Sequence, residues 1–253
     1  MSNICVVFLC DKAYFQKFIN TCNQLIQVGN YTGEICLIIG DDLNNDSLLN
    51  CDFIKQNNII VKYFPNIIFP KEFLDINNKL TTTDGRNITK KFQWHKMHVF
   101  NTYFKRWEYV FYIDCGMTIY SDITPLLNSR MKNKIVAHSD AYPTYVWKLE
   151  CQFEKGNTIY NRLENAYNLN IDYFQTGIFI LDTNLIEDDT FKKLYNLSLE
   201  YPISRTNEQG IIALYFTNIK PSFQQITTHN SETYFYDALS RNRNNKYIML
   251  KMV

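Results

Sequence analysis

The chain has 253 residues and a mass of 30.1 kDa, and 46% of its residues are hydrophobic while 20% are charged, which suits a globular protein with a sizeable core. Its 26 basic and 25 acidic residues leave a net charge of +1 without any long charged run, and this argues against a protein that coats nucleic acid. Seven cysteines without a C-x-x-C pair and no apolar window of roughly 20 residues predict a cytoplasmic protein without a disulfide framework, zinc site or membrane span.

Apolar runs alternate with amphipathic stretches in the first part of the chain. Residues 4–9 are a continuous apolar run of strand length, typical of a strand that is buried on both faces, and residues 34–39 and 59–63 are predicted as a second buried strand and a third strand. Between the first two runs, residues 15–26 repeat apolar side chains at helical spacing, and Gly29 offers a stop. This β-α-β-α-β order predicts a parallel, doubly wound sheet.

The remaining elements are less regular, and no internal repeat or linker divides the chain. Residues 65–91 read as a long loop with at most one short helix, and a loop of this length is usually functional or mobile. The further predicted elements are a helix over 92–104, strands over 109–113 and 178–181, a helix over 206–217 and a last short strand over 247–250. We therefore expect a single α/β domain over residues 1–253.

Lys96 interrupts an otherwise apolar face of the helix predicted over 92–104. Phe92, Val99 and Phe100 share that face at helical spacing. Two interpretations stay open. The ammonium group either snorkels into water from the edge of the core, or it points into a pocket toward an anion.

Asp114 ends the apolar run over 109–113 and is followed by Cys115 and Gly116. A carboxylate at the carboxyl end of a parallel strand lies where open α/β sheets bind ligands. The alternative is a turn aspartate that bonds its own backbone. A third unusual segment is the polar run Gln175-Thr176-Gly177 before the strand at 178–181, which indicates either a loop folded against a polar ligand or a plain turn.

These segments, in this order, resemble the glycogenin-like retaining glycosyltransferases (family 8). The resemblance implies a GT-A fold, which is a Rossmann-like, mostly parallel sheet flanked by helices. It covers most of residues 4–216, with no match over 65–91 and weak matching over 141–170. The segments that carry it are Leu9 to Tyr14, His95 to His98, Tyr112 to Gly116, Ser121 to Leu126, Asp172 to Gly177 and Glu208 to Ile211.

The resemblance also implies roles for single residues. It places the nucleotide in the half over 1–116 and the donor sugar and acceptor in the half over 117–253. The nucleotide-binding residues would be Leu9, Cys10, Asp11, Tyr14, Lys96, Asp114, Cys115, Gly116 and Lys251. The donor-sugar residues would be Asp140, Gln175, Thr176, Gly177 and Gln209. The catalytic residues would be Lys96, Asp114, Glu208 and Gln209. Gln209 has a competing structural role, because Thr206-x-x-Gln209 has the form of a helix capping box.

The metal site implied by the resemblance is altered in this sequence. Gly116 stands where the family has its second metal-binding aspartate, and Lys251 falls at or next to a metal-binding histidine. The family's Mn²⁺ or Mg²⁺ is therefore a doubtful cofactor, with Asp114 as a weak ligand at most. We expect Lys96 and Lys251 to supply part of the missing positive charge.

We therefore expect an enzyme that moves a sugar from a nucleoside diphosphate to a hydroxyl of a glycan or protein acceptor. The expected nucleotide is UDP, and the reaction is expected to be independent of metal. The main alternative is an inactive homologue that serves as a nucleotide-sugar or glycan-binding module, which the altered metal site favours. A nucleotidyltransferase would need a Gly-rich phosphate loop, and the 8 glycines form none. No nucleic-acid partner is expected, and a homodimer is left open.

Overall fold

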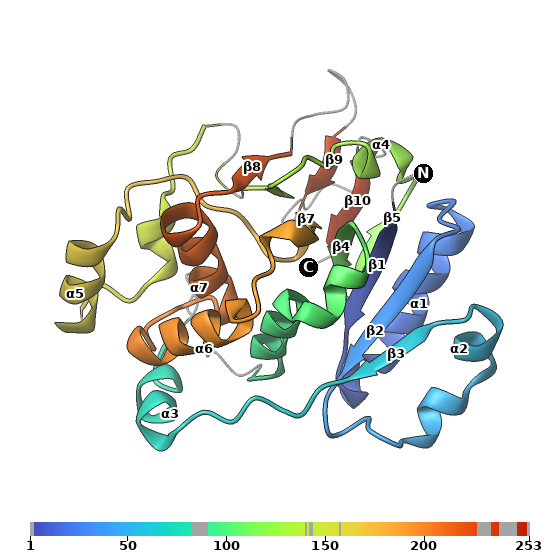
Figure 1. Cartoon of the computed structure of the whole chain (residues 1–253), viewed down its shortest axis with the longest axis horizontal. Helices are drawn as coiled ribbons and strands as arrows, with labels where there is room; N and C mark the ends of the chain where they lie inside the picture. The colour runs from blue at the N-terminus through green and yellow to red at the C-terminus, as the bar shows by residue number, and fades with distance from the viewer. Residues whose placement is uncertain are drawn as a thin grey trace.

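A mixed sheet of seven strands, in the order β3-β2-β1-β4-β7-β6-β8, forms the centre of the structure (Figure 1). The computed structural model describes residues 3–81, 91–139, 141, 144–156, 158–226, 234–237 and 247–251. The strands of this sheet are β1 (Ile4–Leu9), β2 (Glu34–Ile39), β3 (Ile60–Tyr63), β4 (Tyr109–Ile113), β6 (Ile135–Ala137), β7 (Ile178–Asp182) and β8 (Phe223–Gln225). A second sheet of order β5-β10-β9 consists of β5 (Met117–Ile119), β10 (Tyr247–Lys251) and β9 (Tyr234–Asp237).

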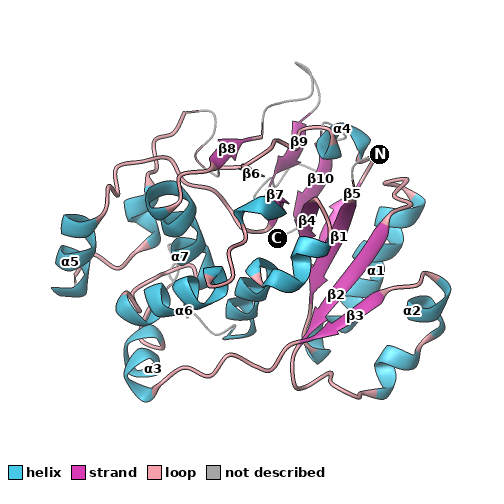
Figure 2. Cartoon of the chain, viewed as in Figure 1, coloured by secondary structure: helices cyan, strands magenta, loops and turns pink. Residues whose placement is uncertain are grey.

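Helices flank the central sheet (Figure 2). The α-helices are α1 (Phe15–Gln27), α2 (Asp52–Gln56), α3 (Lys71–Asn77), α4 (Thr124–Leu127), α5 (Thr158–Ala166), α6 (Thr190–Glu200) and α7 (Glu208–Leu214). Short 3₁₀ helices are η1 (Lys12–Tyr14), η2 (Ser47–Asn50), η3 (Lys91–Phe100), η4 (Thr102–Arg106), η5 (Leu149–Gln152) and η6 (Thr183–Leu185), and α7 continues as a π-helical turn, η7 (Tyr215–Ile219). No helix in the described ranges is both long and apolar enough to cross a membrane.

Strands β3, β2, β1 and β4 run parallel, as the order of elements along the sequence predicts. Strand β1 lies between β2 and β4, and its side chains alternate between two cores because successive residues of a strand point to opposite faces. Cys5 and Val7 belong to the core that contains residues of η3, α6 and α7, whereas Val6 and Phe8 belong to the core that contains residues of α1. The predicted α/β domain, with a mostly parallel sheet flanked by helices, is confirmed.

Strand β7 reverses the direction of the sheet. It pairs antiparallel with β4, so that Ile113 lies opposite Ile178, and it pairs antiparallel with β6 on its other side. The sequence predicts β7 as a strand but not its direction. The consequence is that the carboxyl end of β4 lies beside the amino end of β7. The segment that follows β4 and the segment that precedes β7 therefore meet at the same edge of the sheet.

The prediction of one continuous helix over 92–104 is wrong. Two 3₁₀ segments, η3 and η4, occupy this region and are separated by Asn101, which is extended and whose side chain accepts a hydrogen bond from the backbone N–H of Tyr103. Asparagine favours such a cap over a position inside a helix. In η3 every residue from Trp94 to Phe100 is buried, since the segment packs against α6, α7 and the sheet, so the expected division into apolar and polar faces does not exist.

The predicted helix over 206–217 begins two residues later, at Glu208, and the predicted capping box does not form. The Thr206 hydroxyl donates instead to the side chain of Gln152 at 2.7 Å. Asn207, at the N-cap, has a φ of 53° and makes no side-chain cap. The short helix expected within 65–91 is α3, and residues 82–90 lie outside the described part of the chain.

The substitution Phe179→Ala is expected to lower the free energy of unfolding by about 3–5 kcal/mol. Phe179 is fully buried and its ring stacks on Phe100 and Tyr112 at centroid distances of 5.9 and 5.1 Å, so truncation leaves a cavity where η3, β4 and β7 meet. Urea unfolding followed by circular dichroism measures the loss. The control Ile68→Ala, at a side chain that is 83% exposed, should change stability by less than about 0.5 kcal/mol. Equal losses in the two variants would contradict this packing.

Candidate functional site

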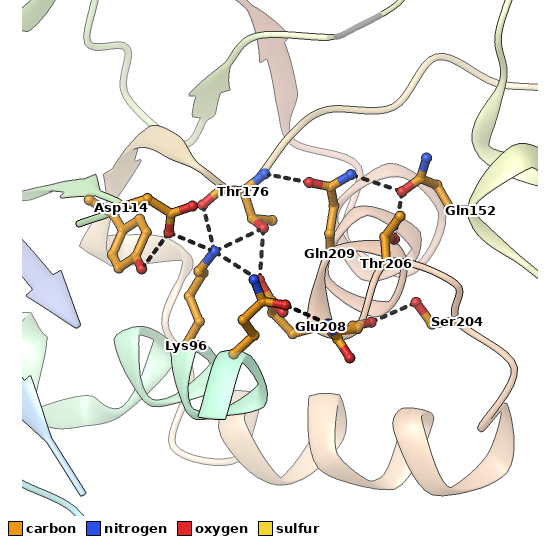
Figure 3. Close-up of polar contacts among 11 residues, drawn as sticks. Lys96, Asp114, Gln152, Thr176, Ser204, Thr206, Glu208 and Gln209 are labelled. Carbon is orange, nitrogen blue, oxygen red and sulfur yellow. Dashed lines mark hydrogen bonds and ion pairs between the residues drawn. The ribbon is translucent and has the colours of Figure 1, made fainter. Parts of the chain in front are cut away.

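Lys96 lies at the centre of a buried polar cluster (Figure 3). Its Nζ contacts Asp114 Oδ1 at 3.1 Å and Glu208 Oε1 at 2.8 Å, and it donates to the carbonyl oxygen and Oγ1 of Thr176 at 3.1 and 3.3 Å. The side chain is only 4% exposed, so the ammonium group does not reach water by snorkelling. An ammonium group has three hydrogens, and these acceptors are sufficient to engage all of them.

The cluster joins three parts of the chain that are far apart in sequence. Asp114 follows β4, Thr176 precedes β7, and the backbone N–H of Asp114 donates to the carbonyl oxygen of Gly177 at 2.8 Å, which extends the antiparallel ladder by one step. Glu208 opens α7, and its Oε1 also accepts from the Thr176 hydroxyl at 3.0 Å. Two predicted site residues, Lys96 and Asp114, are therefore in direct contact, and Thr176 and Glu208 join them.

Burial and charge oppose each other at Lys96. Burial alone would lower the pKa of Lys96, but the negative charges of Asp114 and Glu208 outweigh it, and the pKa is raised. The pKa of Glu208 is also raised, mainly by burial and further by the charge of Asp114, because Lys96 offsets only part of the lost hydration. Tyr112 completes the cluster by donating its hydroxyl to Asp114 Oδ1 at 2.8 Å, and burial raises the pKa of Tyr112 well above its usual value.

Two amide side chains, Gln209 and Gln152, connect to the Thr176 segment on the side away from Lys96 (Figure 3). Gln209 Oε1 accepts from the backbone N–H of Thr176 at 3.2 Å, and Gln209 Nε2 donates to Gln152 Oε1 at 2.9 Å. The Thr206 hydroxyl donates to the same oxygen of Gln152, which fixes the orientation of both amides. Gln152 and Thr206 are not among the predicted site residues. Gln152 lies in 141–170, where the family resemblance is weak, and with the charged residues Glu150 and Glu154 close by it does not stand out in the sequence.

The predicted nucleotide-binding residues within 9–14 lie beside the Asp-Cys-Gly turn over 114–116. The thiol of Cys115 donates to the carbonyl oxygen of Leu9 at 3.2 Å. Leu9 and Cys10 are buried, whereas the half-buried Asp11 accepts from the backbone N–H of Tyr14 at 2.9 Å and so shapes the short helix η1. The structure thus brings the two predicted nucleotide-binding segments together.

The structure describes the side chains of some of the remaining predicted site residues but not of others. Gln175 is buried, and its backbone N–H donates to the carbonyl oxygen of His138 at 2.8 Å, so the predicted sugar loop lies next to the end of β6. Asp140 lies outside the described residues. The backbone of Lys251, in β10, is opposite Met117 and therefore near the turn over 114–116, while its side chain is outside the described part.

The described residues do not fit a divalent cation held by several carboxylates. Asp114 Oδ1 already contacts the ammonium group of Lys96 and the hydroxyl of Tyr112. Gly116 has a φ of 97°, a backbone conformation that disfavours an aspartate or any other L side chain. Among the residues that the structure describes, no group of three or more His, Cys, Asp or Glu side chains is arranged to hold a metal ion. In the described part of the chain, the arrangement is a buried ammonium group paired with carboxylates.

Several solved glycosyltransferase structures resemble this fold. The galactosyltransferase LgtC in complex with donor and acceptor sugar analogues matches with a TM-score of 0.60 at 12% identity, over 98% of this chain and 86% of that chain. An active-site mutant of LgtC matches over the same shares with a TM-score of 0.62, also at 12% identity. The mannosyltransferase Ktr4p from S. cerevisiae in complex with GDP matches with a TM-score of 0.51 at 12% identity, over 84% of this chain and 66% of that chain.

Comparison by sequence does not assign the chain to a family. Neither a protein-family model nor a curated protein matches the chain by sequence. At 12% identity the structural likeness establishes the fold alone, and it agrees with the sheet order and the flanking helices described above. The chain has the GT-A fold.

Proposed function

We propose that this chain is a glycosyltransferase that moves a sugar from a nucleoside diphosphate to a hydroxyl of a glycan or protein acceptor. The observation that carries this proposal is the cluster of Lys96, Asp114, Thr176 and Glu208, which lies at the edge of the sheet where β4 ends. Open α/β sheets bind ligands at the carboxyl ends of their strands. Two structures with this fold, LgtC and Ktr4p, were determined with sugar analogues and with GDP, respectively.

Two polar segments suit a bound donor sugar. Each sugar hydroxyl must keep its hydrogen bonds when it leaves water, so amide, hydroxyl and carboxylate side chains are the appropriate partners. Gln175 and Thr176 precede β7, Gln209 opens α7, and Gln209 bonds Thr176 directly. We assign these residues and Asp140 to the sugar, and the half of the chain over 1–116 to the nucleotide.

Two further assignments, a uracil base in the donor and retention of the configuration at the anomeric carbon, rest on the sequence resemblance to family 8 glycosyltransferases. The acceptor hydroxyl is itself the nucleophile, so the reaction needs no nucleophilic side chain. The bond between the anomeric carbon and the diphosphate oxygen breaks while the bond to the acceptor oxygen forms. The acceptor hydroxyl gives its proton to the departing diphosphate, and the remaining negative charge of the diphosphate must be neutralised. We propose that protein cations neutralise it without a metal ion.

A second candidate function is a nucleotide-sugar or glycan-binding module without catalysis. The feature that favours it is the altered Asp-Cys-Gly turn, in which Gly116 supplies no carboxylate. The two functions differ in turnover, because both predict binding but only the enzyme releases a sugar from its nucleotide.

Asp114→Asn is expected to lower kcat/KM for sugar transfer by about tenfold or more, because it removes the half-buried carboxylate of the cluster. A panel of UDP- and GDP-sugars first identifies the donor by thermal shift, and release of nucleotide then measures turnover. Asp122→Asn is the matched control, since asparagine preserves the cap that Asp122 provides to the backbone N–H of Thr124. Donor binding without any turnover in the wild-type protein would favour the binding module.

Turnover is expected to persist in excess EDTA, because the described residues do not form a metal site. The assay compares the EDTA-treated protein with the same protein after addition of Mn²⁺ or Mg²⁺. A complete loss of activity that either ion restores would show that a metal ion is required.

The raised pKa of Glu208 predicts an unusual pH dependence of stability. Burial favours the protonated carboxyl group, so the stability that Glu208 contributes is present below its ordinary pKa of 4.5 and is lost as pH rises through its raised pKa. The free energy of unfolding of the wild-type protein should therefore fall relative to Glu208→Gln as pH rises above 4.5.

Glu187→Gln is the control for this measurement. The ammonium groups of Lys193 and Lys220 lower the pKa of Glu187 to about 2, so its contribution is lost only as pH falls below 4.5. The difference between the wild-type protein and Glu187→Gln should stay nearly constant from pH about 5 to about 8. A constant difference for Glu208→Gln as well would contradict the raised pKa of Glu208.

A further inference from the structure

The buried cluster has no net positive charge to offer a ligand. Lys96 contributes one positive charge, and Asp114 and Glu208 contribute two negative charges when both are ionised or one when Glu208 is protonated. The hydrogens of the Lys96 ammonium group are engaged by these carboxylates and by Thr176. A nucleoside diphosphate at this edge of the sheet therefore needs a cation from another residue.

The side chain of Thr21 links helix α1 to the turn over 114–116 and to the residue that follows it. The Thr21 hydroxyl accepts from the backbone N–H of Gly116 at 3.0 Å and donates to the carbonyl oxygen of Met117 at 3.0 Å. Thr21 is buried, so this contact sets the position of the helix against the turn. Residues four apart lie on the same face of a helix, and Lys17 is therefore directed to the same turn as Thr21.

Lys17 occupies the space beside Gly116. Its Cδ lies 3.8 Å from the position that a Cβ at Gly116 would take, and among the described residues no other heavy atom outside the chain neighbours of Gly116 lies within 4 Å of that position. The ammonium group of Lys17 continues over the ring of Tyr14, with Nζ 4.3 Å from the ring centroid. The lysine thus spans the gap between the turn after β4 and the segment after β1.

The charge of Lys17 is not used elsewhere in the described part of the chain. Lys17 is exposed and forms no ion pair with the carboxylates that the structure describes. The nearby Lys12 differs, because it pairs with Asp46 at 2.7 Å. An ammonium group is a compact point charge that binds phosphate oxygens well.

We propose that Lys17 binds the diphosphate of the nucleotide and provides a positive charge at the place where the carboxylates of a metal site are missing. This inference rests on the proposed function, because it assigns a residue to the same ligand. The stem of Lys17 lies against Gly116, and the carboxyl ends of β1 and β4 lie side by side. A lysine that lies across this edge can follow the diphosphate as it departs and gains negative charge.

The test compares the binding of UDP, GDP, UMP, GMP, uridine and guanosine to the wild-type protein and to Lys17→Met by calorimetry at low salt. For the base that binds, the diphosphate should bind Lys17→Met about tenfold or more weakly, while the nucleoside should bind both proteins equally. Lys17→Arg should keep most of the affinity, because the charge remains. Lys192→Met removes an exposed lysine of α6 and is the matched control, with unchanged affinity.

Each other outcome has a definite meaning. If Lys17→Met binds the diphosphate as tightly as the wild-type protein, the role of Lys17 is refuted while the proposed function stands. An equal loss for the nucleoside and the diphosphate would also refute it, because the lysine would then act on the base or on the fold. If the wild-type protein binds none of these nucleotides, the proposed function fails as well. A thermal melt of each variant confirms that the exposed substitutions leave the fold intact.

Discussion

The ion pairing of one buried ammonium group organises this end of the molecule. Lys96 separates two carboxylates, Asp114 and Glu208, that would otherwise repel each other in a region with little access to water. Removing one partner from a buried ion pair typically costs about 3–5 kcal/mol, since the remaining charge is left without compensation. The end of β4, the loop before β7 and the start of α7 therefore hold their positions together, and none of them can shift without disturbing the others.

The antiparallel strand β7 supplies the geometry on which this pairing depends. If β7 ran parallel to β4, the loop that precedes it would lie at the opposite edge of the sheet from Asp114. Its reversed direction places Thr176 next to Asp114, and the amide groups of Gln209 and Gln152 then hold the loop from outside. Side chains held by several hydrogen bonds lose little freedom when a ligand arrives, which is the condition for a preorganised site.

The turn after β4 combines a glycine conformation with a contact to α1. The positive φ of Gly116 favours glycine for conformational reasons, so the lack of a side chain at this position agrees with the shape of the turn. The hydroxyl of Thr21 accepts a hydrogen bond from the backbone N–H of Gly116 and so attaches α1 to the turn. A lysine one helical turn earlier then lies against the space that a carboxylate would fill. Turn geometry, helix placement and charge are consistent with one another.

Most of the fold could be predicted from local patterns. The strands β1, β2 and β4 have the predicted bounds, because each is a continuous apolar run, and a strand buried on both faces requires such a run. The unusual positions of Lys96 and Asp114 were also visible, since a charged residue in an apolar context stands out in the sequence. The short strands β5, β6, β8 and β9 were not predicted, because three or four residues carry too little pattern.

The sequence by itself determined the α/β class, the parallel half of the sheet and the candidate residues, since these depend on the periodicity of neighbouring side chains. Only the tertiary structure decided the direction of β7, the 3₁₀ form of η3 and the partners of Lys96. It alone identified Gln152, Thr206 and Lys17 as neighbours of the site. These features depend on contacts between residues that are far apart along the chain, and no local pattern of residues records such contacts.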